Sequence, residues 1–208
     1  MATRGPGLIR LAAALVAAVF VADLFWGLVA DSTGSLAYAL IDEPAHLATG
    51  AVALLALVVA GAPVSRRFAV AALLASTAID IDHLPGYLGS HLLMASSMPR
   101  PYSHSVLTVA LLLALGLYLR GDRREVSFGL AFGVAAHLCR DLATGPGVPL
   151  LWPLSAAPVT VPYAAYAAVL SIAGAGVAIS ARHGLRRRPG RRRLPARPLP
   201  SGGRPGGS

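Results

Sequence analysis

Long apolar stretches separated by short polar segments make up most of the first 181 residues. The stretches lie at approximately 8–30, 45–62, 68–82, 104–119, 126–140 and 158–181. A helix that spans a bilayer needs about 20 predominantly apolar residues. The first, second and sixth stretches reach that length, whereas the other three are shorter and are also compatible with re-entrant segments. The pattern predicts an all-α integral membrane protein, a bundle of about six transmembrane helices with short third and fifth helices.

Composition supports the same class. Hydrophobic residues make up 55% of the 208 residues and charged residues only 13%, with a mean hydropathy of +0.64. An average soluble domain has roughly 25% charged residues. So few charges argue against a soluble enzyme and against a disordered protein. We therefore expect one membrane-embedded domain over residues 1–181. The absence of lysine beside abundant Ala, Gly, Pro and Arg is typical of GC-rich bacterial sequences.

The arginines predict how the helices are oriented. All 18 basic residues are arginine, and nine of them lie from Arg182 onward. If six helices cross the membrane from a cytoplasmic N-terminus, only Arg100 and Arg140 lie outside, as the positive-inside rule favours. We therefore expect a cell-membrane protein with both termini in the cytoplasm. The Arg-, Pro- and Gly-rich segment 182–208 is predicted to be a disordered tail held near anionic lipid, and no nucleic-acid partner is expected.

The same topology gathers most polar side chains at the outer membrane face. This outer group contains, in chain order, Asp42, Glu43, His46, Asp80, Asp82, His83, Arg100, His104, His137 and Asp141. We expect its first three members at the start of the second helix. The i, i+4 spacing of His137 and Asp141 places imidazole and carboxylate on one helical face. Asp23, inside the first helix, is expected to pair with a polar group of another helix.

These residue types predict a metal site. Imidazole and carboxylate groups together are ligands for zinc, manganese or iron. Several such groups near hydrocarbon are costly unless they are paired or bound to an ion. The cluster is therefore expected to bind one or two divalent ions, with zinc or manganese favoured.

Three motifs resemble those of a known family. They are Ile79-Asp-Ile-Asp-His83, Arg100-Pro-Tyr-Ser-His-Ser105 and His137-Leu-Cys-Arg-Asp-Leu-Ala-Thr-Gly145. They are similar to the signatures of the YdjM-like, membrane-bound, predicted metal-dependent hydrolases. Ala45-His46 and the segment 147–153 resemble further parts of that family. The resemblance covers roughly residues 42–153, which form the expected core of the metal site.

The chain also departs from the family pattern. Ile79 stands where the family often has proline, and Pro101 and Ser103 differ from its usual R-G-x-T-H-S motif. Neither change removes an expected ligand. Arg140 occupies a position that is usually small or apolar, so the charge balance near Asp141 is expected to differ.

The resemblance and the residue types together predict a membrane-bound metal-dependent hydrolase. The expected metal ligands are His46, Asp82, His83, His104, His137 and Asp141. The metal would lower the pKa of a bound water to about 7. Asp80 and Glu43 are the candidate general bases, with Asp80 alternatively a ligand or an orienting group. Arg100 is expected either to hold an anionic phosphate or carboxylate or to anchor the chain at the interface.

The position of the cluster at the membrane surface favours a lipid or lipid-linked ester or phosphoester as the substrate. Two other functions use the same residues. A metal-ion or proton transporter also needs His and Asp inside the membrane. A non-catalytic scaffold would use a metal only to tie helix ends together.

Overall fold

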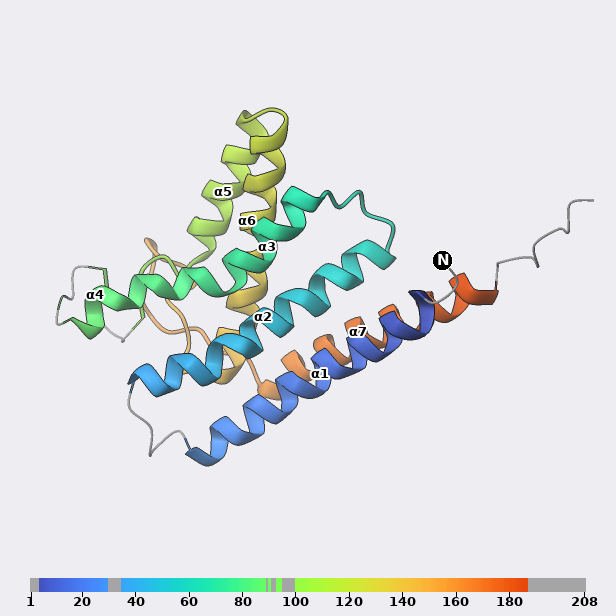
Figure 1. Cartoon of the computed structure of the whole chain (residues 1–208). Coiled ribbons are helices and arrows are strands. Elements are labelled where there is room, and N and C mark those ends of the chain that lie inside the picture. The colour runs from blue at the N-terminus through green and yellow to red at the C-terminus, as the bar shows by residue number, and fades with distance from the viewer. Residues whose placement is uncertain (1–3, 30–34, 89, 91–92, 95–99, 187–208) are drawn as a thin grey trace, which may run out of the picture.

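The structure is a computed structural model that describes residues 4–29, 35–88, 90, 93–94 and 100–186. Within these ranges the chain is helical and contains no strand beyond two isolated bridges. The elements are α1 (Arg4–Val29), α2 (Ser35–Val59), α3 (Arg66–Ala78), the 3-10 helix η1 (Ile79–His83), α4 (Leu84–Tyr87), α5 (Val106–Tyr118), α6 (Asp122–Thr144) and α7 (Tyr163–Arg186). Figure 1 shows their arrangement.

The helices confirm an all-α membrane protein. Five helical segments are long and apolar enough to cross a membrane, namely Gly5–Phe25, Asp42–Val59, Arg66–Gly86, Asp122–Thr144 and Tyr163–His183. The third combines α3 with η1 and α4, which follow it directly. The described part of the expected tail, up to Arg186, continues α7, and residues 187–208 lie outside the described residues.

The prediction that the fifth helix is short was wrong. The fifth predicted stretch corresponds to helix α6, which has 23 residues. The fourth predicted stretch corresponds to helix α5, which has only 13. The apolar stretch 126–140 is only the middle of α6, because a charged first turn precedes it and a polar last turn follows it. Asp122 and Glu125 lie in that first turn, where their negative charges favour the helix N-terminus.

The expected start of the second helix was also misplaced. Helix α2 begins at Ser35, so Asp42 lies about two turns and His46 about three turns inside it. Pro44 also lies within the helix, although proline removes an internal hydrogen bond there. Because residues 36–41 are largely apolar, the helix continues through them, and its polar residues lie in its interior.

The helices pack in two groups. Helices α1, α2 and α7 run side by side, and their buried contacts include Val19, Val52 and Leu170. Helices α3 and α6 pack together, with α5 against α6, around a second cluster that includes Ala75 and Val134. Contacts of α2 with α3 and α6 join the two groups. The candidate site lies where they meet.

The contact between α3 and α6 is unusually close. A Cβ atom added to Gly129 would lie 2.4 Å from the Phe68 carbonyl oxygen, and one added to Gly133 would lie 2.2 Å from that of Ala72. The two glycines are four residues apart on α6 and therefore share one face. Small residues at this spacing let membrane helices approach each other closely. They fix the register in which α6 lies against α3.

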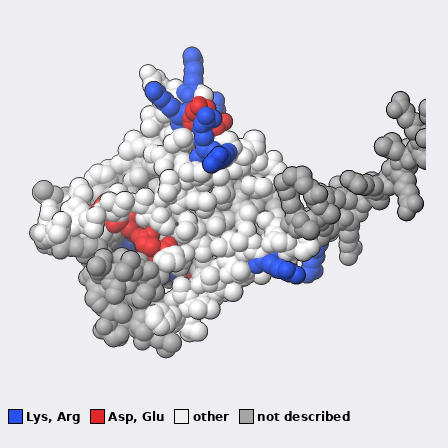
Figure 2. All heavy atoms as spheres, in the orientation of Figure 1, with Lys and Arg blue, Asp and Glu red and all other residues white. Residues whose placement is uncertain are grey.

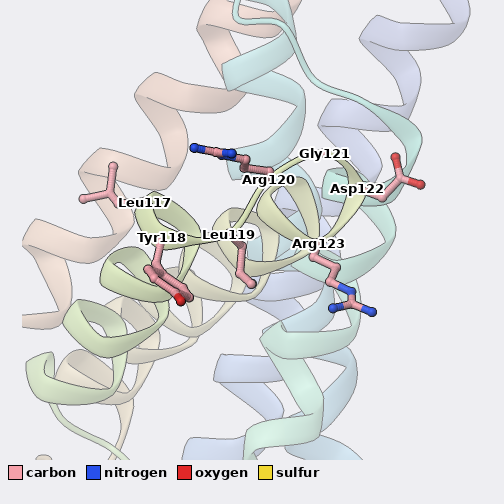
Figure 3. A pocket seen from close by; sticks show the side chains of 7 residues that line it. All are labelled: Leu117, Tyr118, Leu119, Arg120, Gly121, Asp122 and Arg123. Atoms are coloured by element: carbon pink, nitrogen blue, oxygen red, sulfur yellow. The ribbon is translucent and has the colours of Figure 1, made fainter.

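Basic residues gather at the far end of the α5–α6 hairpin (Figure 2). The turn carries Arg120, Arg123 and Arg124, and Arg67 at the start of α3 pairs with Asp122 at 2.8 Å. Residues 117–123 line an open hollow at this turn (Figure 3). A helix rises about 1.5 Å per residue, so the length of α5 separates this end from His104 by roughly 20 Å. Arginine clustering and the His/Asp group therefore mark opposite ends of the hairpin.

Candidate metal centre

Four segments bring the predicted site residues together. Helix α2 contributes Asp42, Glu43 and His46, η1 contributes Asp80, Asp82 and His83, the segment before α5 contributes Arg100 and His104, and α6 contributes His137 and Asp141. The segments come from distant parts of the sequence. His91 lies outside the described residues, and His183 is exposed near the end of α7.

Four donor atoms converge at the centre of the cluster. The Asp80 Oδ1 atom lies 3.0 Å from His104 Nε2 and 3.4 Å from His137 Nε2. The Asp141 Oδ2 atom lies 3.1 Å from His137 Nε2 and 3.5 Å from His104 Nε2. We call Asp80, His104, His137 and Asp141 the deep set; their donor atoms all lie within 4.8 Å of one another. Two imidazoles and two carboxylates match the four-coordinate chemistry of zinc.

The structure indicates which nitrogen of His137 faces the centre. Its Nδ1 atom lies 3.0 Å from the backbone carbonyl oxygen of Ser76 and donates a hydrogen bond to it. The Nε2 atom then faces Asp80 and Asp141. A hydrogen bond of this kind commonly fixes the tautomer of a metal-binding histidine. Ser76 in turn lies against Gly50 of α2, where an added Cβ would be 2.8 Å from its side chain.

A second group of donors lies on the open side of the cluster. The open set comprises Asp80, Asp82, His83 and His104, again with donor atoms within 4.8 Å of one another. His83 Nε2 lies 3.5 Å from Asp80 Oδ1, and His104 Nδ1 lies 3.6 Å from Asp82 Oδ2. The Ser103 hydroxyl donates to Asp82 and orients its carboxylate. The two sets therefore share Asp80 and His104.

His104 shows the electrostatic character of the centre. Burial by itself lowers the pKa of His104, but hydrogen bonds to Asp80 and Asp82 and the charge of Asp141 outweigh it, so the pKa is raised above its ordinary value. The carboxylates thus favour a positive charge at this position. A bound cation satisfies the same demand.

His46 lies behind the deep set. Its ring stacks on that of His137, with centroids 3.8 Å apart and planes inclined by 14°. His46 Nε2 lies 3.3 Å from Asp42 Oδ2 and 3.5 Å from Asp141 Oδ1. We call Asp42, His46 and Asp141 the back set, whose donor atoms lie within 4.8 Å of one another and whose residues are all buried.

Arg140 is the main site-adjacent residue whose role the sequence did not reveal. It is fully buried and pairs with Asp42 of α2 and, at 2.7 Å, with Asp23 of α1. The Tyr163 hydroxyl donates to Asp23 at 2.9 Å. This confirms the interhelical partner expected for Asp23. In the sequence, Arg140 is recognisable only as a charged residue next to the motif residue Asp141. Its two partners could not be predicted, because Asp42 and Asp23 lie 98 and 117 residues away in the chain.

Arg100 lies against a carboxylate of the cluster. Its guanidinium lies 2.7 Å from Asp141 Oδ2, and the residue is only 6% exposed. An arginine that is buried against a carboxylate does not anchor the chain at a membrane interface. Arg100 instead holds a member of the deep set in place.

The residues present fit a bound metal ion. Several buried side-chain nitrogen and oxygen atoms have no hydrogen-bond partner in the described part of the chain, namely Glu43 Oε2, His46 Nδ1, Asp82 Oδ1, His104 Nδ1, Ser105 Oγ, Arg140 Nε and Asp141 Oδ1. Buried polar atoms are normally paired, and each exception needs an explanation. Among these residues, His46, Asp82, His104 and Asp141 each belong to a group of imidazoles and carboxylates that could hold an ion. Such mixed N/O donors suit a divalent ion.

The cluster is accessible from one side. Side chains of Asp80, Asp82 and His83 are 17%, 18% and 12% exposed, whereas those of His104 and His137 are fully buried. Figure 2 shows acidic side chains at the surface on this side, well away from the basic α5–α6 turn. Ile81, in the same 3-10 helix, is 63% exposed. The partly exposed polar edge of the cluster therefore adjoins exposed apolar surface.

Comparison with known proteins agrees with the motifs. A family model described as YdjM inner membrane protein matches residues 41–194, well over half of the 208 residues. Inner membrane protein YdjM of Escherichia coli (strain K12) is 34% identical over 87 residues, which cover 36% of this chain and 43% of that protein. The protein of the same name from Shigella flexneri has the same identity and coverage. The aligned region thus spans less than half of either relative.

No solved structure matches the chain. The family match extends from α2 across the deep set and beyond the end of α7. It therefore includes every expected metal ligand. The chain belongs to the YdjM inner membrane protein family.

Proposed function

We propose that the protein is a membrane-bound metal-dependent hydrolase acting on an ester or phosphoester of a lipid or lipid-linked molecule. The convergence of the deep set carries this proposal, because two imidazole and two carboxylate donors face one point from three separate segments. The alternative of a scaffold metal is less favoured, since the open set remains partly exposed where a substrate can approach. When bound, the metal supplies a water of lowered pKa and polarises the substrate oxygen.

The residues of the chain divide the remaining work. His104, His137, Asp80 and Asp141 would hold the ion, and Arg100 positions Asp141. Glu43 lies close enough to Asp80 to interact with it, and its Oε2 atom is buried without a partner among the described residues. Glu43 is therefore the better candidate for the group that accepts the proton of water.

Location supports a lipid-like substrate. Ile81 and Leu84, on either side of Asp82 and His83, are 63% and 50% exposed, so the polar edge of the cluster adjoins apolar surface. An amphiphile can place its head at this polar edge and its chains along the apolar rim. The distribution of arginines further supports a site at the outer face, since basic residues favour the cytoplasmic side.

The packing of α3 on α6, between the cluster and the α5–α6 turn, argues against the transporter alternative. A conduction path needs polar groups through the whole membrane. Between His137 and the α5–α6 turn, however, α6 packs on α3 through Gly129 and Gly133. A Cβ atom added to either glycine would lie 2.4 or 2.2 Å from a backbone oxygen of α3. That contact leaves no polar path between these two helices.

The proposal is tested with purified full-length protein in mixed micelles, using a dialkylglycerol phosphate, a diacylglycerol, and soluble 4-nitrophenyl phosphate and acetate. We expect metal-dependent hydrolysis of at least one lipid ester, a loss of about 100-fold or more in His137→Ala, and an unchanged rate in His183→Ala. A thermal unfolding curve of each variant separates lost chemistry from lost folding. Metal flux into liposomes that is abolished by Asp82→Ala, without hydrolysis, would instead establish the transporter.

A further inference from the structure

We propose that the centre holds two divalent ions, a deep one and an open one that share Asp80, and that its substrate is therefore a phosphoester. This inference rests on the proposed function for its reaction, but the two-ion arrangement stands on the geometry alone. Asp80 is suited to be shared because its Oδ1 atom already lies within 3.5 Å of the Nε2 atoms of His83, His104 and His137.

One ion cannot use all of the donors. Donor atoms bound to a single zinc ion lie about 2.0–2.2 Å from it, so any two are at most roughly 4.4 Å apart. Asp82 and His83 share a set with His104 and Asp80, but with neither His137 nor Asp141. The six ligands expected from the sequence therefore surround more than one position.

The deep set satisfies one ion by itself. Its four donors are the number that a zinc ion takes in a structural site, and the Ser76 and Arg100 contacts fix two of them. Asp82 and His83 remain beside it, with Asp82 Oδ1 buried and unpartnered in the described chain. A carboxylate has two oxygens, so Asp80 can join these two residues to the deep ion. Three protein donors with open positions are the usual arrangement of a catalytic metal.

The formal charge of the cluster also supports two divalent ions. The connected cluster contains five aspartates and two arginines, namely Asp23, Asp42, Asp80, Asp82, Asp141, Arg100 and Arg140. With neutral histidines this leaves three negative charges, one more than a single divalent ion neutralises. Uncompensated charge is costly at this depth.

The back set does not bind the second divalent ion. Asp42 already pairs with the buried guanidinium of Arg140, and its other oxygen faces His46. A divalent ion there would lie next to a fixed positive charge in a low-dielectric setting. His46 is therefore assigned as a positioning residue that packs on His137 and faces Asp141, and not as a ligand.

Two ions about 3.5–4 Å apart suit phosphoryl transfer, because together they stabilise the attacking and leaving oxygens. A water oxygen forms a bond to phosphorus, and the bond between phosphorus and the lipid oxygen breaks. Glu43 accepts a proton from the water, and the leaving alkoxide takes a proton from solvent. The products are the lipid alcohol and a phosphate.

Manganese binding tests the two-ion arrangement. The metal-free full-length protein in detergent is titrated with Mn²⁺, with stoichiometry from elemental analysis and the electron paramagnetic resonance spectrum recorded at each step. We expect about two equivalents and an exchange-coupled spectrum for wild type and for His183→Ala. His83→Ala should bind one equivalent and show the six-line spectrum of an isolated ion, because only the open position is lost. One uncoupled equivalent in wild type, unchanged in His83→Ala, would overturn the inference.

Rates measured on the same samples separate this inference from the proposed function. Two coupled ions without hydrolysis of any lipid ester would support the two-ion arrangement and refute the hydrolase. A single bound ion together with hydrolysis would support the hydrolase and refute the two-ion arrangement. We expect the dialkylglycerol phosphate to react at least tenfold faster than the carboxylic ester, and equal rates would overturn the phosphoester assignment. The wild-type stoichiometry needs no variant, so a misfolded His83→Ala would still leave a decisive result.

Discussion

The Nδ1 atom of His137 donates a hydrogen bond to the backbone carbonyl oxygen of Ser76, 3.0 Å away. This contact continues a regular series along the α3–α6 interface. Gly129 meets Phe68, Gly133 meets Ala72, and His137 meets Ser76, each pair four residues beyond the last. The close helix packing and the orientation of the His137 ring therefore have one structural cause.

The glycine contact gives a direct prediction. Gly133→Ala should lower the free energy of unfolding by about 1–3 kcal/mol, because its Cβ would lie 2.2 Å from a backbone oxygen and force the helices apart. Metal affinity should fall as well, since His137 would lose its register with Ser76. Denaturant unfolding and metal titration in detergent measure both effects.

Gly176→Ala is the matched control. Nothing lies within 4 Å of the Cβ position at Gly176, which is also within a helix. Its unfolding free energy should change by less than about 1 kcal/mol. Equal destabilisation by the two substitutions would contradict the packing argument.

Arg140 should be essential for stability. Arg140→Met leaves the Asp23 and Asp42 carboxylates buried without their cation, which costs about 3–5 kcal/mol. The double variant Arg140→Met/Asp23→Asn should recover part of the loss, because it removes one of the two unpaired charges. Arg182→Met, at an exposed position of α7, serves as control and should behave like wild type. The absence of any recovery in the double variant would argue that the ion pair is not the cause.

Arg100 should affect metal affinity more than recognition of an anionic substrate. It contacts Asp141 at 2.7 Å, and residues that orient metal ligands typically contribute 10- to 100-fold in affinity. Arg100→Met should therefore weaken Mn²⁺ binding by about that factor. A normal affinity accompanied by a raised KM for phosphoesters alone would return Arg100 to the role of substrate anchor.

Removal of the metal should destabilise the fold. A ligand that binds only the folded state contributes about 2.7 kcal/mol at a concentration 100 times its Kd. Chelation should thus lower the Tm of wild type and of His183→Ala, and leave Asp80→Ala/His137→Ala largely unchanged. If chelation shifts the Tm of that double variant as much as that of wild type, the stabilising metal lies elsewhere.

The orientation in the membrane can be tested with single cysteines. In a Cys139→Ser background, Ser90→Cys should react with an impermeant thiol reagent from outside intact cells, and Arg123→Cys only after the membrane is opened. The expectation follows from the arginines at the α5–α6 turn and the positive-inside rule. Labelling of position 90 from the cytoplasm alone would place the site at the inner face.

The sequence by itself determined the class of the protein and the residue types of the candidate site. Apolar runs are local features, and a chain segment without water must satisfy its backbone hydrogen bonds internally, so the six stretches predicted helices directly. The ordered motifs around Asp80, His104 and His137 predicted the mixed donor set. Helix ends were less predictable, because Asp122 and Glu125 extend α6 beyond its apolar middle.

Only the tertiary structure decided how the imidazole and carboxylate groups of the cluster divide into separate sets. Sequence spacing cannot show that Asp80 lies near three imidazoles, or that Arg140 pairs with Asp42. Those relationships join residues up to 117 positions apart, and the packing of α3 on α6 sets them. Local pattern specifies which groups lie near the membrane surface. Distances of a few ångströms between helices decide which groups act together, because coordination and ion pairing are effective only at that range.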